Sequence, residues 1–278
     1  MILVIGATGT IGSEVVGQLL AADQRPRALV RDRDKARQLL GERVEQVVGD
    51  LERPETIEAA LAGVDRLFLL TTQSSRQPDW ERTVIEAAAR AGVARLVKLS
   101  VFRADDQSPL RFARQHWQAE RALERSGLAS TIVRPVFLMQ NLRAMVRGGA
   151  IYTAAGDGRV AMIDARDIAA VAVAALTTPG HEGKTYTLTG PEALTFDDVA
   201  NDLSRQSGKQ IQHVRVSVDD VRGALESAGM AAWFADDMAR LHAMLAAGYE
   251  DLVTDEVRAV TGSPARTLAQ FVRDTGGT

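Results

Sequence analysis

Three glycines near the start of the chain, Gly6, Gly9 and Gly12, have the spacing of a phosphate-binding loop. They follow the apolar run Ile2–Ile5 and precede a stretch whose apolar residues recur at helical spacing. Glycine permits a tight turn and lets the backbone approach a pyrophosphate, and the N-terminus of the following helix offers free N–H groups. A strand, the glycine triad and a helix in this order predict a dinucleotide-binding loop. The residues expected to contact the cofactor here are Gly6, Thr8, Gly9, Thr10, Ile11 and Gly12.

The end of the second predicted strand bears on the choice between NAD(H) and NADP(H). An acid at this position accepts from the ribose 2′-hydroxyl of NAD, whereas an arginine accommodates the 2′-phosphate of NADP. This chain has Arg31 there, with Lys35 one helical turn later, so NADP(H) is favoured. Asp32 keeps NAD(H) possible, although its residue type also suits the N-cap of the next helix. Asp50 and Leu51 follow the third predicted strand, and Asp50 is expected either to bind the adenine amino group or to stabilise a turn.

The chain lacks a pair of residues that short-chain dehydrogenases use for proton exchange, a tyrosine with a lysine four positions later. In that pair the lysine lowers the pKa of the tyrosine, which exchanges a proton with a carbonyl or alcohol. At this spacing the tyrosines Tyr152, Tyr186 and Tyr249 are followed by Gly156, Gly190 and Val253. Simple alcohol–ketone chemistry by that route is therefore disfavoured.

Three other residues are candidates for catalysis. His116 and Glu120 are four positions apart on a predicted helix and share one face, so they can interact. A histidine beside a carboxylate can exchange protons near neutral pH. Ser100 lies at the end of the fifth predicted strand, at the edge where open α/β sheets bind ligands. The alternative is a surface pair on an amphipathic helix, with Glu120 serving as an ion-pair partner for nearby arginines.

The first half of the chain alternates short apolar strands with helical patterns, which predicts a Rossmann-type α/β fold with a doubly wound parallel sheet. The strands are expected at 2–5, 27–30, 44–48, 66–70, 96–99 and 131–133, and the helices at 12–20, 34–40, 54–62, 79–91 and 110–126. We expect residues 1–150 to form the NAD(P)-binding core. Residues 151–278 are expected to form a smaller, mostly helical part that completes the core and covers the substrate cleft. Its predicted elements are a helix at 164–176, a strand at 184–188, and helices at 196–206, 218–228, 232–247, 254–260 and 267–274.

Composition limits the classes of function. The 278 residues have 46% hydrophobic and 25% charged content, as is usual for a soluble globular protein. The formal net charge of −3 does not indicate a nucleic-acid partner, and the absence of cysteine excludes disulfides and cysteine-ligated metals. The apolar start is interpreted as a strand rather than a signal peptide, and the longest later apolar stretch, 168–176, is too short to span a membrane. A cytoplasmic monomer or homodimer acting on a small molecule is expected, with no metal.

Taken together, the motifs resemble those of the NmrA-like, atypical branch of the short-chain dehydrogenase superfamily. The pattern is most similar to its NAD(P)H:quinone oxidoreductase and triphenylmethane reductase group. The matching segments are 6–12, 30–31 with 35–36, 49–50, 91–93, 116 with 120, 133–135, 141–142, 164–168, 183–188 and 194–196. The resemblance implies NADP(H) held by the glycine loop, Arg31, Asp50 and Thr71. It also implies a substrate pocket near Ser100, Phe102, His116, Phe137 and Asn141. The segment Lys98–Phe102 departs from the pattern expected of dye reductases, so substrate preference does not carry over.

Three functions are compatible with these residues. The first is an NAD(P)H-dependent oxidoreductase that transfers hydride to a quinone-like or other conjugated aromatic acceptor, which needs little acid–base machinery. The second is a non-catalytic, NAD(P)-binding redox sensor, since the glycine loop serves binding and turnover equally. The third is a tailoring or oxygenation-associated enzyme that acts on a polycyclic aromatic metabolite.

Overall fold

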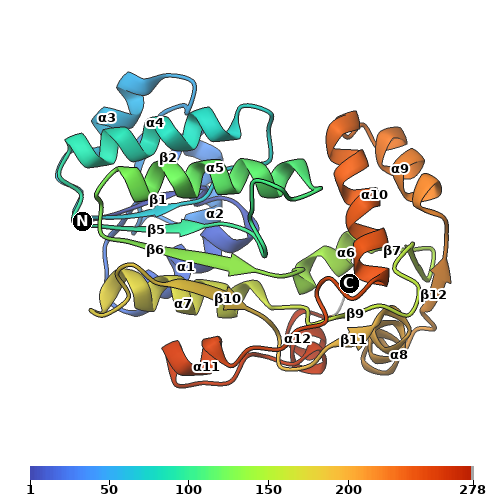
Figure 1. The fold of residues 1–278 in the computed structure, drawn as a ribbon. Helices are drawn as coiled ribbons and strands as arrows, with labels where there is room; N and C mark the ends of the chain where they lie inside the picture. Colours follow the sequence, from blue (N-terminus) through green and yellow to red (C-terminus); the bar gives the residue numbers. More distant parts are fainter. Residues whose placement is uncertain (277–278) are drawn as a thin grey trace. The chain divides into compact units, whose positions relative to one another are not determined.

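The computed structural model describes residues 1–276, and in it a parallel sheet carries the N-terminal motifs (Figure 1). The sheet has seven strands in the order β10-β6-β5-β4-β1-β2-β3. These are β1 (Ile2–Ile5), β2 (Pro26–Val30), β3 (Glu45–Val48), β4 (Arg66–Leu69), β5 (Arg95–Leu99), β6 (Ser130–Pro135) and β10 (Thr185–Leu188). In this order β1 pairs in parallel with both β2 and β4, and the chain winds outward in both directions from it. The predicted Rossmann-type fold is confirmed.

Helices cover both faces of this sheet, which explains why its central strands are continuously apolar. The flanking helices are α1 (Thr10–Ala21), α2 (Arg33–Leu40), α3 (Pro54–Leu61), α4 (Gln77–Arg90), α5 (Arg111–Arg125) and α7 (Ala165–Thr177). Figure 1 shows α3, α4 and α5 on one face and α1 and α7 on the other. All four residues of β1 are buried, as expected for a strand that is covered on both sides. The carboxyl ends of β1, β2 and β4 therefore form one edge, where the loops that follow them meet.

Nearly half of the chain forms a second set of elements with two small sheets of its own. A three-stranded sheet joins β12 (Gln212–Arg215), β8 (Ala150–Thr153) and β7 (Val146–Arg147), and β11 (Leu194–Thr195) pairs with β9 (Arg159–Val160). The helical elements here are η1 (Met139–Asn141), α6 (Leu142–Met145), α8 (Phe196–Ser207), α9 (Val218–Ser227), α10 (Ala232–Ala246), α11 (Glu256–Thr261) and α12 (Leu268–Thr275). The predicted elements end within two residues of the observed ones. The sequence analysis missed these short strands because two to four residues carry too little periodicity.

The two compact units of the chain do not divide at residue 150. The chain forms two compact units that interleave in sequence, because segments from the middle of the chain return to the parallel sheet. One unit comprises 1–106, 115–134 and 168–186, and the other comprises 107–114, 135–167 and 187–276 of the described chain. We call them the sheet unit and the second unit. That residues 151–278 complete the core and cover the substrate cleft stays a prediction. Within residues 1–276, no helix is both long and apolar enough to cross a membrane.

Candidate active site

The glycine loop between β1 and α1 needs its first and third glycines for steric reasons. Gly6 has a positive φ of 80°, and a Cβ atom on it would lie 2.5 Å from the carbonyl oxygen of Leu70. A Cβ atom on Gly12 would lie 2.0 Å from the carbonyl oxygen of Gly6. Gly9 is the N-cap of α1 and brings no side chain to cap the helix. The first N–H groups of α1 are thus left for a ligand, which is what an anion-binding helix N-terminus requires.

A cleft of about 580 Å³ opens at this edge of the sheet, within the usual range of about 300–1,000 Å³ for small-molecule sites. Its wall is formed by residues at or just beyond the carboxyl ends of β1, β2, β3 and β4. Of the predicted cofactor residues, seven line it: Gly6, Thr8, Gly9, Arg31, Asp50, Leu51 and Thr71. The chain therefore brings three separate predicted motifs to one cleft, as cofactor binding demands.

Four predicted cofactor residues, Thr10, Ile11, Gly12 and Lys35, are not in the cleft wall. Ile11 is buried under the loop, and Gly12 packs against the Gly6 backbone. The Lys35 side chain is exposed on α2 and its backbone N–H donates to Asp32. Their contact with a cofactor stays a prediction, and for Ile11 and Gly12 the structure supports a role in shaping the loop instead.

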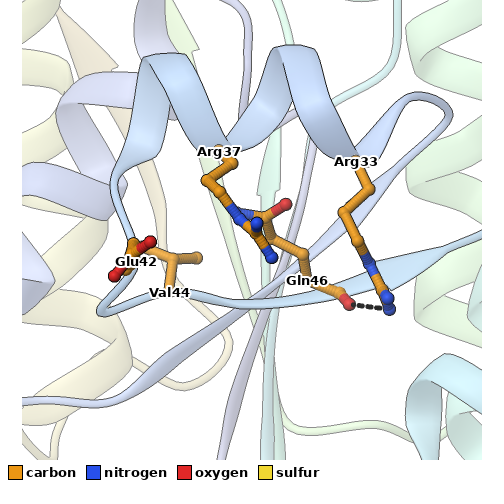
Figure 2. A pocket seen from close by; sticks show the side chains of 5 residues that line it. All are labelled: Arg33, Arg37, Glu42, Val44 and Gln46. Atoms are coloured by element: carbon orange, nitrogen blue, oxygen red, sulfur yellow. Dashed lines mark hydrogen bonds between the residues drawn. The ribbon is translucent and has the colours of Figure 1, made fainter.

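Arg31 is the basic residue among those that line the cleft. It directly follows β2, where an acid would be expected in an NAD-specific site. Neighbouring arginines on α2 point elsewhere, because Arg33 and Arg37 extend from α2 toward β3 (Figure 2), and Arg33 donates to the carbonyl of Gln46 at 3.0 Å. Arg31 is therefore the cation that this wall offers to an anionic ligand.

The two aspartates near the cleft have local structural roles. The side chain of Asp32 accepts from the backbone N–H of Lys35 at 3.0 Å and caps α2, as the alternative interpretation predicted. The side chain of Asp50 accepts from the N–H of Glu52 at 3.0 Å, which stabilises the turn after β3. The cap engages one oxygen of Asp32, and Asp32 is not among the residues that line the cleft.

At the carboxyl end of β5, Ser100 and Glu120 form one buried cluster with Arg134. The hydroxyl of Ser100 donates to Glu120 Oε1 at 2.5 Å, and Arg134 Nε donates to the same oxygen at 3.0 Å. A second guanidinium nitrogen of Arg134 binds Glu120 Oε2, so the pair is bidentate. Both oxygens of Glu120 are thus engaged as acceptors.

His116 has partners other than the predicted Glu120. Its Nδ1 accepts from the Lys98 ammonium at 3.0 Å, because lysine can only donate, and its Nε2 lies 3.3 Å from the side-chain amide of Gln77. Burial, together with the positive charge of Lys98, lowers the pKa of His116 well below its ordinary value. The interaction of His116 with Glu120 expected from their spacing is wrong, because each side chain turns toward a different charged partner.

Lys98 and Glu81 connect this histidine to the cleft, and the sequence analysis missed both. The Lys98 ammonium lies 2.9 Å from Glu81 Oε2, in an ion pair rather than a well-directed hydrogen bond, and both side chains are fully buried. The hydroxyl of Thr71 donates to Glu81 Oε1 at 2.9 Å. The available signal was a lysine inside an otherwise apolar strand that was predicted to be covered on both faces.

The predicted substrate residues fall in different units. Phe102 lies in the sheet unit and is buried, with the Arg103 guanidinium over its ring at 4.9 Å from the centroid. Phe137 lies in the second unit, where it packs edge-to-face on Phe196, and Asn141 is exposed in the same unit. Their common substrate pocket stays a prediction.

Comparisons with known proteins agree with this geometry. The family model of the NmrA-like family matches residues 1–252. The NAD(P)H azoreductase of Xenophilus azovorans is 43% identical over 277 residues, which cover 98% of this chain and 97% of that protein. The NADPH-dependent quinone oxidoreductase of Escherichia coli, solved with NADPH, is 32% identical with a TM-score of 0.87 over 99% of both chains. Triphenylmethane reductase of Citrobacter sp., solved with NADP(H), is 31% identical with a TM-score of 0.86 over 99% of both chains.

Fold and cleft together define a dinucleotide-binding oxidoreductase, and the relatives confirm that predicted class and its use of NADP(H). The chain belongs to the NmrA-like family.

Proposed function

We propose that the chain transfers hydride from NADPH to a neutral conjugated double bond, such as a quinone or an azo group. The observation that carries the choice of acceptor is at the carboxyl end of β5, where each predicted acid–base residue is already held by another side chain. Ser100 donates to Glu120, Glu120 is held by Arg134, and His116 is held by Lys98. An acceptor that delocalises the incoming electron pair itself suits such a site, because the protein then mainly aligns the reactants.

The residues of the cleft suit the cofactor. The amides of Thr8 and Gly9 and the N-terminus of α1 would bind the pyrophosphate, and Arg31 would pair with the 2′-phosphate. Bound NADPH would supply the hydride, and the matching proton of the two-electron reduction would come from water. Alcohol–ketone interconversion would require a positioned proton donor, which this arrangement does not offer.

The names of the relatives support the same class of acceptor. An azoreductase and a quinone oxidoreductase both act on conjugated double bonds that accept two electrons. A cytoplasmic monomer or homodimer with no nucleic-acid partner is part of the proposal, and the net charge of −3 is compatible with it.

The proposal is tested by following NADPH oxidation with a simple benzoquinone, a neutral azo dye and an unconjugated ketone. We expect turnover with the first two and none with the ketone. Reduction of the ketone at a similar rate would show that the protein supplies the proton itself and would overturn the choice of acceptor. Tight NADPH binding with no oxidation by any acceptor would favour the redox-sensor alternative.

The role of His116 is tested with the same assay. Since burial and Lys98 keep the ring neutral and both its nitrogens are engaged, His116→Gln should retain quinone turnover. Turnover lost at unchanged NADPH affinity would restore His116 as the proton donor that the sequence suggested.

A further inference from the structure

The buried ion pair Glu81–Lys98 ends at the wall of the cleft, and this position has a chemical consequence. Both side chains are fully buried, and the cost of removing two charges from water offsets much of their attraction, so the pair is weak evidence for stability. Glu81 comes from α4 and Lys98 from β5, and they meet behind Thr71, which follows β4 closely and lines the cleft. The ion pair is therefore placed where it acts on a residue of the ligand site.

The Thr71 hydroxyl has one proton and gives it to Glu81. Its Oγ1 lies 2.9 Å from Glu81 Oε1, and the hydroxyl can donate only once. A carboxylate has no proton to return, and the other oxygen of Glu81 lies 2.9 Å from the ammonium of Lys98. The Thr71 oxygen can then only accept a further hydrogen bond.

We propose that Lys98 and Glu81 are positioning residues that fix Thr71 as a hydrogen-bond acceptor for a donor group of the bound dinucleotide, in first place a ribose hydroxyl. This inference rests on the proposed function. A threonine with a free hydroxyl rotates to suit either partner, whereas this one has a fixed polarity. The cleft would thus discriminate for O–H or N–H donors at this point of its wall and against acceptors such as phosphate oxygens.

The variant Glu81→Gln inverts this polarity at nearly constant shape. The amide oxygen would face the Lys98 ammonium, which can only donate, and the amide nitrogen would then face Thr71. Thr71 would accept from the amide and turn its own proton into the cleft, against the donor of the cofactor. A buried donor facing a donor leaves both unsatisfied, so NADPH affinity should fall about tenfold.

The experiment is a double-mutant cycle on the dissociation constant of NADPH, measured by calorimetry with Glu81→Gln, Thr71→Val and their combination. We expect each single variant to weaken binding, and Glu81→Gln to have little further effect once Thr71 is valine. Thr71→Ser, which keeps the hydroxyl, should bind as the original chain does. Asp167→Asn, a buried acid paired with Arg266 in the second unit, is the matched control and should leave the constant unchanged.

Steady-state kinetics of Glu81→Gln give a further readout, which a purely structural role of Glu81 would not change selectively. Glu81→Gln should raise the KM for NADPH and leave the KM for the quinone unchanged. The donor of the cofactor could be a ribose hydroxyl or the carboxamide of the nicotinamide. Binding of 2′-phospho-ADP-ribose, which keeps both riboses but lacks nicotinamide, separates these two groups. A loss of affinity that persists with this fragment assigns a ribose hydroxyl, and one that disappears assigns the carboxamide.

Several outcomes would overturn the inference. Unchanged NADPH affinity in Glu81→Gln would overturn it. An equal loss of NADPH affinity from Glu81→Gln in the original chain and in Thr71→Val would overturn it as well. If Glu81→Gln does not fold, unchanged affinity in Thr71→Val excludes an acceptor role for Thr71 and removes the inference. If the original chain binds no NADPH, the proposed function fails as well, so the two failures are distinguishable.

Discussion

The glycine loop and the buried cluster around Lys98 lie in the same unit but are built from different parts of the chain. The loop is made by backbone groups, and a Cβ atom at Gly6 or Gly12 would collide with a carbonyl oxygen. The cluster is made by buried polar and charged side chains from α4, α5 and β5, each of which depends on the others for a partner. The loop is therefore sensitive to added volume, and the cluster is sensitive to lost charge.

The largest effect should come from added volume in the loop. Gly12→Val would place its Cβ 2.0 Å from the Gly6 carbonyl oxygen, so the β1–α1 turn must open and NADPH binding should be lost. Gly17→Ala is the matched control, because a Cβ there meets nothing within 4 Å and α1 should gain about 0.5–1 kcal/mol. Calorimetry and thermal unfolding measure both effects. Retained NADPH binding in Gly12→Val would show that the loop tolerates volume and would weaken the comparison.

The second-largest effect should come from removing one charge from the cluster around Lys98. Lys98→Met leaves Glu81 buried without its cation, and breaking such a pair from one side costs about 3–5 kcal/mol of unfolding free energy. Replacing both residues by methionine should restore much of the stability, since a buried pair is often replaceable by apolar groups. Urea unfolding compares the three proteins. A Lys98→Met protein as stable as the original would mean that the ion pair is not formed in solution.

Lowering the pH should reduce the free energy of unfolding through buried side chains and not through the glycine loop. Burial lowers the pKa of His242 to about 4 from its ordinary 6.5, so the unfolded chain takes up a proton there at higher pH than the folded chain. Stability is then fully present above pH 6.5 and falls by about 3 kcal/mol as the pH drops from 6.5 to 4. His116, whose pKa is also lowered, should add to this loss in the same direction.

Unfolding free energies measured across this pH range check the acid effect. The variants His242→Gln and His116→Gln should each flatten the dependence, and the double variant should flatten it most. An unchanged slope in His242→Gln would mean that this ring is not buried in solution.

The smallest effect is expected at the exposed cation of the cleft wall. Arg31→Asp should weaken NADPH binding by about 1.5–3 kcal/mol, the range for hydrogen bonds to charged groups, and should spare NADH. Arg33→Asp is the control, because that side chain binds the Gln46 carbonyl (Figure 2) and should not set cofactor preference. Equal losses for the two cofactors in Arg31→Asp would remove Arg31 from the 2′-phosphate.

The comparison also explains which features were predictable from the sequence. The glycine loop, the helices and the central strands follow from local patterns, because turn sterics and the periodicity of buried faces act over a few residues. The N-cap role of Asp32 was equally local. Glu81 and Lys98 were missed because their pairing joins residues on two different elements, and the one local signal, a lysine inside an apolar strand, does not indicate its partner.

His116 and Glu120 show that spacing within one helix can also predict an interaction that does not form. Helical spacing places them on one face of α5, which is why an interaction between them was expected. The partners that decide their chemistry, Lys98 for one and Arg134 for the other, come from neighbouring strands. Hydrogen bonds and ion pairs to a charged group in the buried interior outweigh the weak contact between residues on one helix face.

The sequence by itself therefore determined the Rossmann-type fold, the phosphate-binding turn and the basic residue at the end of β2, because each depends on short-range sterics or hydrophobic periodicity. Tertiary structure alone decided that seven of the predicted cofactor residues share one cleft, that the units interleave in sequence, and that a buried ion pair stands behind Thr71. Such pairings depend on which elements pack together, and packing is settled by the whole core rather than by any one segment.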